Sequence, residues 1–279
     1  MPVSRIKNLI ILILALTAAF LLVLVVPTKL AQLDEAREMR TRLQTLFASY
    51  GVSLDAESLP QGRSLYTLEI SETERGVQTA AQALLGTSAA KESSSRQRSV
   101  YTSAAGVCSF GAGGSFEALL SERAAVSNPS DDAVKLMRKF GFEASSVLAV
   151  SASNEGKQQI FCTQALRGVP IFSDGLLLEY QNGVLVCISG QFFPGADQLT
   201  AVGAQSAISC ADALVSLLSS RDTLGWVGSH ILAVEQGYRY TDTAAATLRF
   251  IPVWLIETDT DRFYVNAVTG EVSLDAAQS

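Results

Sequence analysis

The chain contains one histidine, His230, at the start of the strand-like segment HILAVEQ. A single imidazole cannot supply the histidine pair of an H-E-x-x-H zinc site. A Ser-His-Asp triad would need an exposed serine nucleophile beside it, and the sequence has no G-x-S-x-G turn to present one. We therefore expect His230 to lie on the surface or at a strand edge, without a catalytic or metal-binding role.

Two short motifs match parts of known catalytic and phosphate-binding sites. Ser88 and Lys91 have the S-x-x-K spacing of penicillin-recognising enzymes, but that chemistry also needs S-D-N and K-T-G segments, which the chain lacks. The motif falls in a Ser-rich stretch, Thr87–Ser99, that we interpret as a loop. The glycine-rich segment Phe110–Ser115 has no G-K-[ST] after it, so we expect a hairpin corner and not a phosphate site.

Paired carboxylates could act as the acid and base of a glycosidase. Two pairs are close in sequence, Asp131 with Asp132 and Asp259 with Asp261. Both fall where helix starts and turns favour aspartate, because its side chain accepts hydrogen bonds from nearby backbone N–H groups. We predict structural roles for both pairs, and we expect the chain to be no enzyme and to bind neither cofactor nor metal.

The four cysteines, Cys108, Cys162, Cys187 and Cys210, form no C-x-x-C motif, so neither a zinc ribbon nor a thioredoxin-type redox site is predicted. Cys162 and Cys187 lie in apolar strand patterns, where a cysteine is most often a small buried hydrophobic side chain. A disulfide between these two is the main alternative.

Length and charge limit the classes of partner. The 279 residues allow a membrane anchor plus one large or two small domains. Lys and Arg number 21 against 27 Asp and Glu, which gives a net charge of -6. Since an acidic chain offers little to neutralise a phosphate backbone, nucleic acid is not an expected partner.

The N-terminus has the pattern of a membrane anchor. Arg5 and Lys7 precede an unbroken apolar run, Leu9–Val26, which is long enough to span a bilayer. The positive-inside rule then places residues 1–8 in the cytoplasm, a transmembrane helix at 9–28, and the rest of the chain outside the cell membrane. A cleaved signal peptide has the same charge order, but its apolar region is usually shorter and ends at a small-x-small site, which is missing here.

One face of this predicted helix could contact a partner within the membrane. Leu12, Ala15, Ala19 and Leu22 share it, and Ala15 and Ala19 form a small-x-x-x-small pair. Small residues let two transmembrane helices approach closely, because lipid provides no hydrophobic drive for their association. The alternative is that these alanines only reflect the ordinary composition of membrane helices.

The exterior begins with an amphipathic helix that leaves the membrane and ends near Gly51. A strand at Arg63–Ser71, a helix that stops at Gly86 and two or three short strands follow. Ser121–Ser130 reads as the join between domains, so we predict an N-terminal α+β domain at 29–125 and a C-terminal one at 126–279.

A pattern of one helix and four strands occurs twice in the second domain. The first copy starts at NPSDDAVKLMRKFGF and the second at SCADALVSLLSSRDTLG, and later turns are marked by Asn182-Gly183 and Thr269-Gly270. A sheet with one apolar face must cover it, and the helix is the element available to do so. The predicted fold class is α+β, with a single N-terminal transmembrane helix followed by two helix-on-antiparallel-sheet units.

Three segments together resemble a known family. The start SRIKN with its apolar run, the segment GVPIFSDGLLLEYQNGVLVCISG and the ending IPVWLIETDTDRFYVNAVTGEVS are similar to the YycI and YycH regulatory proteins of the WalK–WalR two-component system of Gram-positive bacteria. The resemblance covers nearly the whole chain. It implies a non-enzymatic membrane protein that restrains a WalK-like sensor histidine kinase, mainly through transmembrane contacts, together with a paralogous YycH-like regulator.

Two other functions stay open. G-V-P-I-F and the ending are also similar to PepSY-type and metalloprotease propeptide modules, which implies an inhibitor or chaperone of a cell-surface protease. An enzyme that acts on the cell wall is a third and weaker hypothesis.

Overall fold

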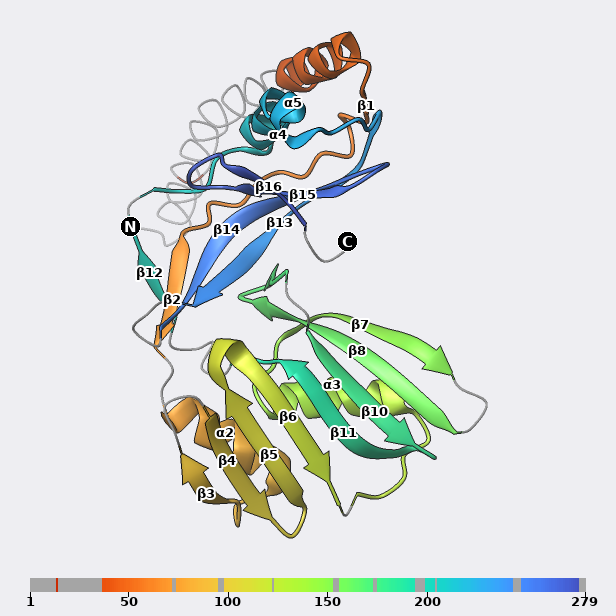
Figure 1. Ribbon diagram of the computed structural model, residues 1–279, viewed down its shortest axis with the longest axis vertical. Coiled ribbons are helices and arrows are strands. Elements are labelled where there is room, and N and C mark those ends of the chain that lie inside the picture. The colour runs from red at the N-terminus through yellow and green to blue at the C-terminus, as the bar shows by residue number, and fades with distance from the viewer. Residues whose placement is uncertain are drawn as a thin grey trace, which may run out of the picture.

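The computed structural model contains two large, mostly antiparallel sheets and few helices, so the α+β class is confirmed (Figure 1). The nine-stranded sheet is built from the middle of the chain, and the seven-stranded sheet from its two ends. The residues described by the structure are 14, 37–71, 74–94, 98–121, 123–152, 156–172, 175–193, 199–203, 205–242 and 247–275.

The nine-stranded sheet has the order β3-β4-β5-β6-β11-β10-β8-β7, with β9 paired to β8. In the middle of the sheet, β6 and β11 pair in antiparallel register, with Ile188 opposite Ala118. This pair joins the run β3–β6 edge to edge with the run β7–β11. The strands are β3 (Ala90–Ser94), β4 (Arg98–Ser103), β5 (Gly106–Gly111), β6 (Ser115–Leu120), β7 (Ala144–Ala152), β8 (Lys157–Leu166), β9 (Val169–Pro170), β10 (Leu176–Gln181) and β11 (Val184–Gln191).

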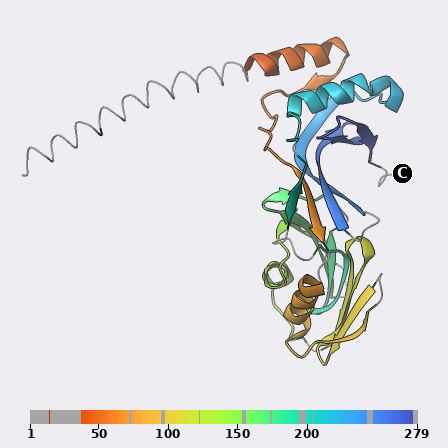
Figure 2. The same ribbon diagram turned by 90° about the vertical axis from the view of Figure 1, so that its left-hand side faces the viewer.

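Two helices, α2 (Glu74–Leu85) and α3 (Pro129–Lys139), cover one side of this sheet (Figure 2). Both contribute to one buried cluster, in which Ala81 and Met137 are fully buried. Phe192 lies at its centre and contacts four other phenylalanine rings, with the ring of Phe140 nearest at 4.6 Å between centroids. Because the sheet has helices on one side only, its other side is left open.

The seven-stranded sheet has the order β1-β13-β14-β15-β16, and β2 joins β14 to β12. Only the β1–β13 pair is parallel among the described strands. In the nine-stranded sheet described above, the short turn η1 (Ala112–Gly114) joins β5 to β6. The following elements belong to the seven-stranded sheet and its helices. The elements here are β1 (Ser53–Leu54), β2 (Thr67–Ser71), β12 (Thr200–Val202), α4 (Cys210–Ser219), α5 (Arg221–Leu224), β13 (His230–Asp242), β14 (Thr247–Thr258), β15 (Arg262–Asn266) and β16 (Val272–Leu274).

Helix α4 begins with a complete capping box. The Ser209 hydroxyl accepts from the Asp212 N–H at 3.1 Å, and the Asp212 carboxylate accepts from the Ser209 N–H at 3.3 Å. These reciprocal bonds satisfy two N–H groups that a helix start otherwise leaves unpaired. Helix α3 begins at Pro129, with Asn128 as its N-cap.

Residues 37–49 form a helix that packs beside α4 on the seven-stranded sheet (Figures 1 and 2). Leu43 and Phe47 are buried in the same cluster as Leu214 and Leu217 of α4 and Trp254 of β14. Arg221 fixes the end of this helix, because its guanidinium donates to the Tyr50 carbonyl at 2.7 Å. The amphipathic helix predicted after the apolar run is thus part of a core.

Each sheet takes strands from both sides of the predicted boundary between 29–125 and 126–279, which itself stays a prediction. The elements from α2 to β6 share a sheet with β7–β11, whereas residues 53–54 and 67–71 belong to the sheet of β13–β16. The strand pairings that join these segments, β6 with β11 and β2 with β14, link residues far apart in sequence. Such non-local pairing leaves no trace in hydrophobic periodicity, so the sequence could not reveal it.

Helix-plus-four-strand units occur three times. The two predicted copies correspond to α3 with β7, β8, β10 and β11, and to α4 with β13–β16. A third, α2 with β3–β6, was missed because part of it falls in the stretch Thr87–Ser99, which we expected to be a loop. Strand β3 occupies Ala90–Ser94, and its side chains are mainly small and polar, so they give no apolar signal.

The predicted anchor lies outside the described residues. Of the run Leu9–Val26 the structure describes only Leu14, and Leu12, Ala15, Ala19 and Leu22 are not described. In the parts that are described, no helix combines the length and the apolar character needed to cross a bilayer.

Replacing Phe47 with alanine tests whether the helix at 37–49 belongs to the core. We expect a loss of about 3 to 5 kcal/mol in the free energy of unfolding, since a buried ring leaves a cavity. Both tryptophans of the chain, Trp226 and Trp254, lie in this cluster, so their fluorescence during urea unfolding reports on it. Met39→Ala is the control, because Met39 is 52% exposed on the same helix and should change stability by less than about 0.5 kcal/mol. Equal effects of the two substitutions would contradict this packing.

Candidate functional site

A cleft of about 810 Å³ lies between the two sheets. Its lining residues come from the uncovered sides of the sheets, near the contact of Ile171 with β13. Strand alternation explains its lining. In β8, Ile160 and Cys162 point to the helices, so Phe161 and Thr163 point to the cleft.

The wall from the seven-stranded sheet is formed in the same way. Trp254 and Ile256 of β14 pack under the helices, and Leu255 and Glu257 face the cleft. Leu255 lies opposite Glu235 of β13 in the strand register. The cleft is therefore lined by charged, aromatic and aliphatic side chains that point away from the helix-covered cores of the two layers.

A close backbone contact holds the two walls together. The Phe172 N–H donates to the Tyr238 carbonyl at 2.8 Å, and the Phe172 ring lies 5.8 Å from the Tyr264 ring. A Cβ at Gly237 would lie 2.5 Å from the Phe172 ring, so only glycine fits there. The side-chain amide of Gln191 also donates to the Tyr240 hydroxyl across the layers.

Of the two arginines in the cleft, one forms an ion pair and the other stacks on an aromatic ring. Arg262 forms an ion pair with Glu257 at 2.6 Å. Arg239 instead places its guanidinium over the ring of Tyr264, 4.3 Å from the centroid, and within the described chain it forms no ion pair with a carboxylate. Burial, with a smaller contribution from the Glu257 charge, raises the pKa of Glu235 above its usual value. Burial likewise raises the pKa of Tyr264, and the nearby Asp275 adds to this.

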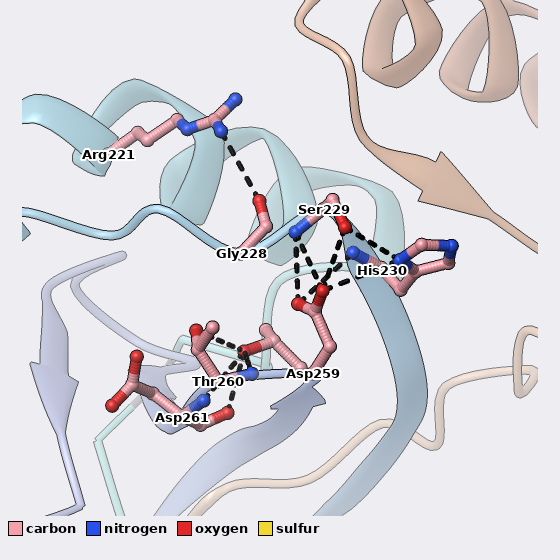
Figure 3. A network of polar contacts seen from close by, with 8 residues as sticks. Arg221, Gly228, Ser229, His230, Asp259, Thr260 and Asp261 are labelled. Carbon is pink, nitrogen blue, oxygen red and sulfur yellow. Dashed lines mark hydrogen bonds and ion pairs between the residues drawn. The ribbon is translucent and has the colours of Figure 1, made fainter.

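A second polar cluster joins Asp259, in the turn after β14, to the start of β13 (Figure 3). The Asp259 carboxylate accepts from the Ser229 N–H at 2.9 Å, the His230 N–H at 3.2 Å and the Ser229 hydroxyl at 2.8 Å. These bonds, led by the Ser229 N–H, hold the pKa of Asp259 well below its usual range.

This cluster has the residue types of a catalytic triad but not its geometry. In a triad the imidazole stands between serine and aspartate and uses a different nitrogen for each. Here the same atom, His230 Nδ1, faces both the Ser229 oxygen at 2.7 Å and the Asp259 carboxylate at 3.4 Å. Because the serine hydroxyl already donates to Asp259, the three groups form a turn cap and not a proton relay.

Comparison with solved structures gives several distant likenesses, two of which are described below. No protein-family model and no curated protein matches the chain. It is similar to an uncharacterized protein from Eubacterium rectale, with a TM-score of 0.46 and 10% identity over 77% of this chain and 86% of that one. It is also similar to the C-terminal domain of YpeB from Bacillus megaterium, with a TM-score of 0.36 and 14% identity over 76% of this chain and 99% of that one.

The residues singled out in the sequence lie apart from the cleft. His230 is exposed at the start of β13, as expected. Asp131 bonds to the N-cap Asn128, and Asp132 accepts from the Tyr180 hydroxyl at 2.9 Å, so each has a structural contact. Ser88 lies in a turn and Lys91 in β3.

The cysteines are all free, and three of them, Cys108, Cys162 and Cys210, are buried. Cys162 points into the core under the helices, whereas Cys187 is half-buried and pairs with Glu179 on the open side. Strand β10 also lies between their two strands. The alternative of a Cys162–Cys187 disulfide is therefore wrong.

Sequence reasoning missed the cleft residues Arg239, Tyr264 and Glu235. A signal was present in β13, because Glu235 and Arg239 share one strand face whose neighbouring positions hold an alanine, a glycine and a threonine. Nothing in the sequence indicated that this face would lie opposite β8.

Asp259→Asn should reduce stability at neutral pH and flatten its dependence on acid pH. A carboxyl group whose pKa is lowered by folding stabilises the fold above its unfolded pKa of about 3.9, and the effect is lost as the pH falls further. Thermal midpoints of the wild type should therefore drop more steeply below about pH 4 than those of the variant.

The matched control is Asp261→Asn, two residues along the same turn. The contacts of Asp261 with Thr258 use its backbone N–H and carbonyl, so this substitution should leave both the midpoint and its pH dependence unchanged. Identical acid profiles for Asp259→Asn and the wild type would show that the cap contributes nothing.

Proposed function

We propose that this chain is a membrane-anchored regulator outside the cytoplasm that restrains a sensor histidine kinase by binding it. The kinase would be WalK-like, and a YycH-like paralogue would be a further partner. The sequence supports this through the apolar run Leu9–Val26 and the segments that resemble YycI and YycH. The chain would act through contacts and not through turnover.

The observation that carries this proposal is the burial of the helix at 37–49. This helix follows the apolar run along the chain, and its Phe47 is fully buried against α4 and β14. A displacement that reaches residue 37 would therefore be passed to the seven-stranded sheet by the packed side chains of this helix. That rigidity is what a regulator needs if events outside are to alter a contact within the membrane.

Such coupling requires a difference in affinity between two kinase states, because a partner that binds both equally shifts neither. A coupling of about 1 to 3 kcal/mol is usual for allosteric proteins. One well-packed transmembrane face is enough for this, and we assign that role to Leu12, Ala15, Ala19 and Leu22. The small side chains of Ala15 and Ala19 would allow a close helix approach.

The exterior also offers surfaces for binding. The cleft between the sheets has the size of a ligand or peptide site. The Ser229, His230 and Asp259 cluster is arranged as a turn cap, which supports binding over hydrolysis as the activity.

The double substitution of Ala15 and Ala19 by leucine tests the proposal. Tagged chain is purified from membranes, and a co-purified histidine kinase is identified by mass spectrometry. We expect at least a tenfold loss of kinase with the double variant, which corresponds to about 1.4 kcal/mol of binding free energy. The bulky side chains would keep the two helices apart.

Thr17→Leu is the matched control, since an ideal helix places residue 17 opposite the Ala15 and Ala19 face. It should retain the kinase. Unchanged recovery of kinase with the double variant would refute the membrane contact. Capture of a protease by the fragment that starts at Leu30, with no kinase recovered by the full chain, would favour the protease inhibitor instead.

A further inference from the structure

Three hollows adjoin along β13 and together form one trough. The cleft of about 810 Å³ shares Ser145, Pro170 and Glu235 with a hollow of about 360 Å³ on one side. On the other side it shares Arg239 and Tyr264 with a hollow of about 270 Å³. The trough follows β13 from Val234 to Thr241, which is about 23 Å at the rise of a β-strand.

We propose that this trough binds an extended peptide segment of a partner protein, and that Arg239 takes an Asp or Glu side chain of that segment. The proposal is independent of the membrane contact argued above, because it concerns the opposite side of the seven-stranded sheet. About seven residues in extended conformation have the length of the trough.

The charge of Arg239 determines which side chain it takes. Arginine binds carboxylates through two parallel N–H donors, so it is the residue best suited to such an anchor. Its neighbour Arg262 is already neutralised by Glu257 at 2.6 Å, whereas the guanidinium of Arg239 faces an aromatic ring and forms no ion pair within the described part of the chain. An incoming carboxylate would therefore complete an ion pair without breaking one.

The position of Arg239 is set before the peptide arrives. Tyr264 is buried, and the centroid of its ring lies 4.3 Å from the guanidinium. The ring of Phe172 packs against the Tyr264 ring, with 5.8 Å between the two centroids. Stacking on an aromatic face restricts the long arginine side chain, so less conformational entropy is lost on binding. Tyr264 is thus a positioning residue for this contact.

The remaining lining suits a peptide backbone and mixed side chains. Thr241 offers a hydroxyl group for backbone hydrogen bonds, and Phe161 and Leu148 offer apolar contacts. The hydroxyls of Ser146 and Thr163 bond to each other at 2.7 Å and add a polar surface beside them. Glu235 lies four residues before Arg239, about 13 Å away along the same strand face. Its carboxylate would repel a second acidic residue at that distance, so a single acidic position is expected in the segment.

The experiment is a selection from a displayed library of random seven-residue peptides on the purified full chain in detergent. Binders to the wild type should be enriched in Asp or Glu at one position. Synthetic versions of the selected peptides should bind Arg239→Gln at least tenfold more weakly, and Arg239→Lys more weakly than the wild type, because lysine lacks the planar two-donor group.

Arg138→Gln is the matched control, since Arg138 is exposed on α3, which covers the other side of the nine-stranded sheet. It should bind the peptides as the wild type does, and circular dichroism should show all three variants folded. Binders without an acidic preference, binders enriched in Lys or Arg, or equal affinity for wild type and Arg239→Gln would overturn the proposal. None of these results depends on whether a kinase is recovered.

Discussion

A buried contact between Gln164 and Phe193 fixes the aromatic ring that joins the two sheets, and the joint between the layers depends on it. Gln164 is fully buried, and its side-chain amide accepts from the Phe193 N–H at 3.0 Å and donates to the Phe193 carbonyl at 3.1 Å. The Phe193 ring then packs against Tyr240 and Phe250 of the other sheet. Because a buried amide left unpaired would cost about 1 to 3 kcal/mol, the joint strongly favours one arrangement of the layers.

Space for this joint comes from a glycine. A Cβ at Gly114 would lie 2.4 Å from the Phe193 ring, and the backbone there has a φ of 76°, which glycine adopts without strain. The fixed angle between the sheets keeps their uncovered sides apart at β8 and β13. The trough along β13 thus has two causes. The Phe193 contact joins the two layers, and each sheet is covered by helices on one side, so the other side can line the trough.

Local features of this fold could be predicted from the sequence, and non-local ones could not. The helix of α4 and the turns at Asn182-Gly183 and Thr269-Gly270 depend on neighbouring residues, and they were predicted. The pairing of β6 with β11 depends on which strand edges remain free after the hairpins form. For the same reason the sequence showed Asp259 as a turn residue but not its contact with Ser229, 30 positions away.

The helix at 37–49 and the trough lie on opposite sides of the same sheet, and β14 connects them residue by residue. Trp254 packs under the helices with Phe47, while its neighbour Leu255 faces the trough with Tyr264. A packed sheet does not bend easily at one residue, so binding in the trough would be transmitted as a tilt of the whole layer. Such a tilt would move the helix at 37–49 with it, since that helix is part of the core of the layer. In the function proposed above, a peptide in the trough and the membrane contact would therefore be coupled through rigid-body movement, and the size of the coupling would be set by how differently each ligand binds the two tilts.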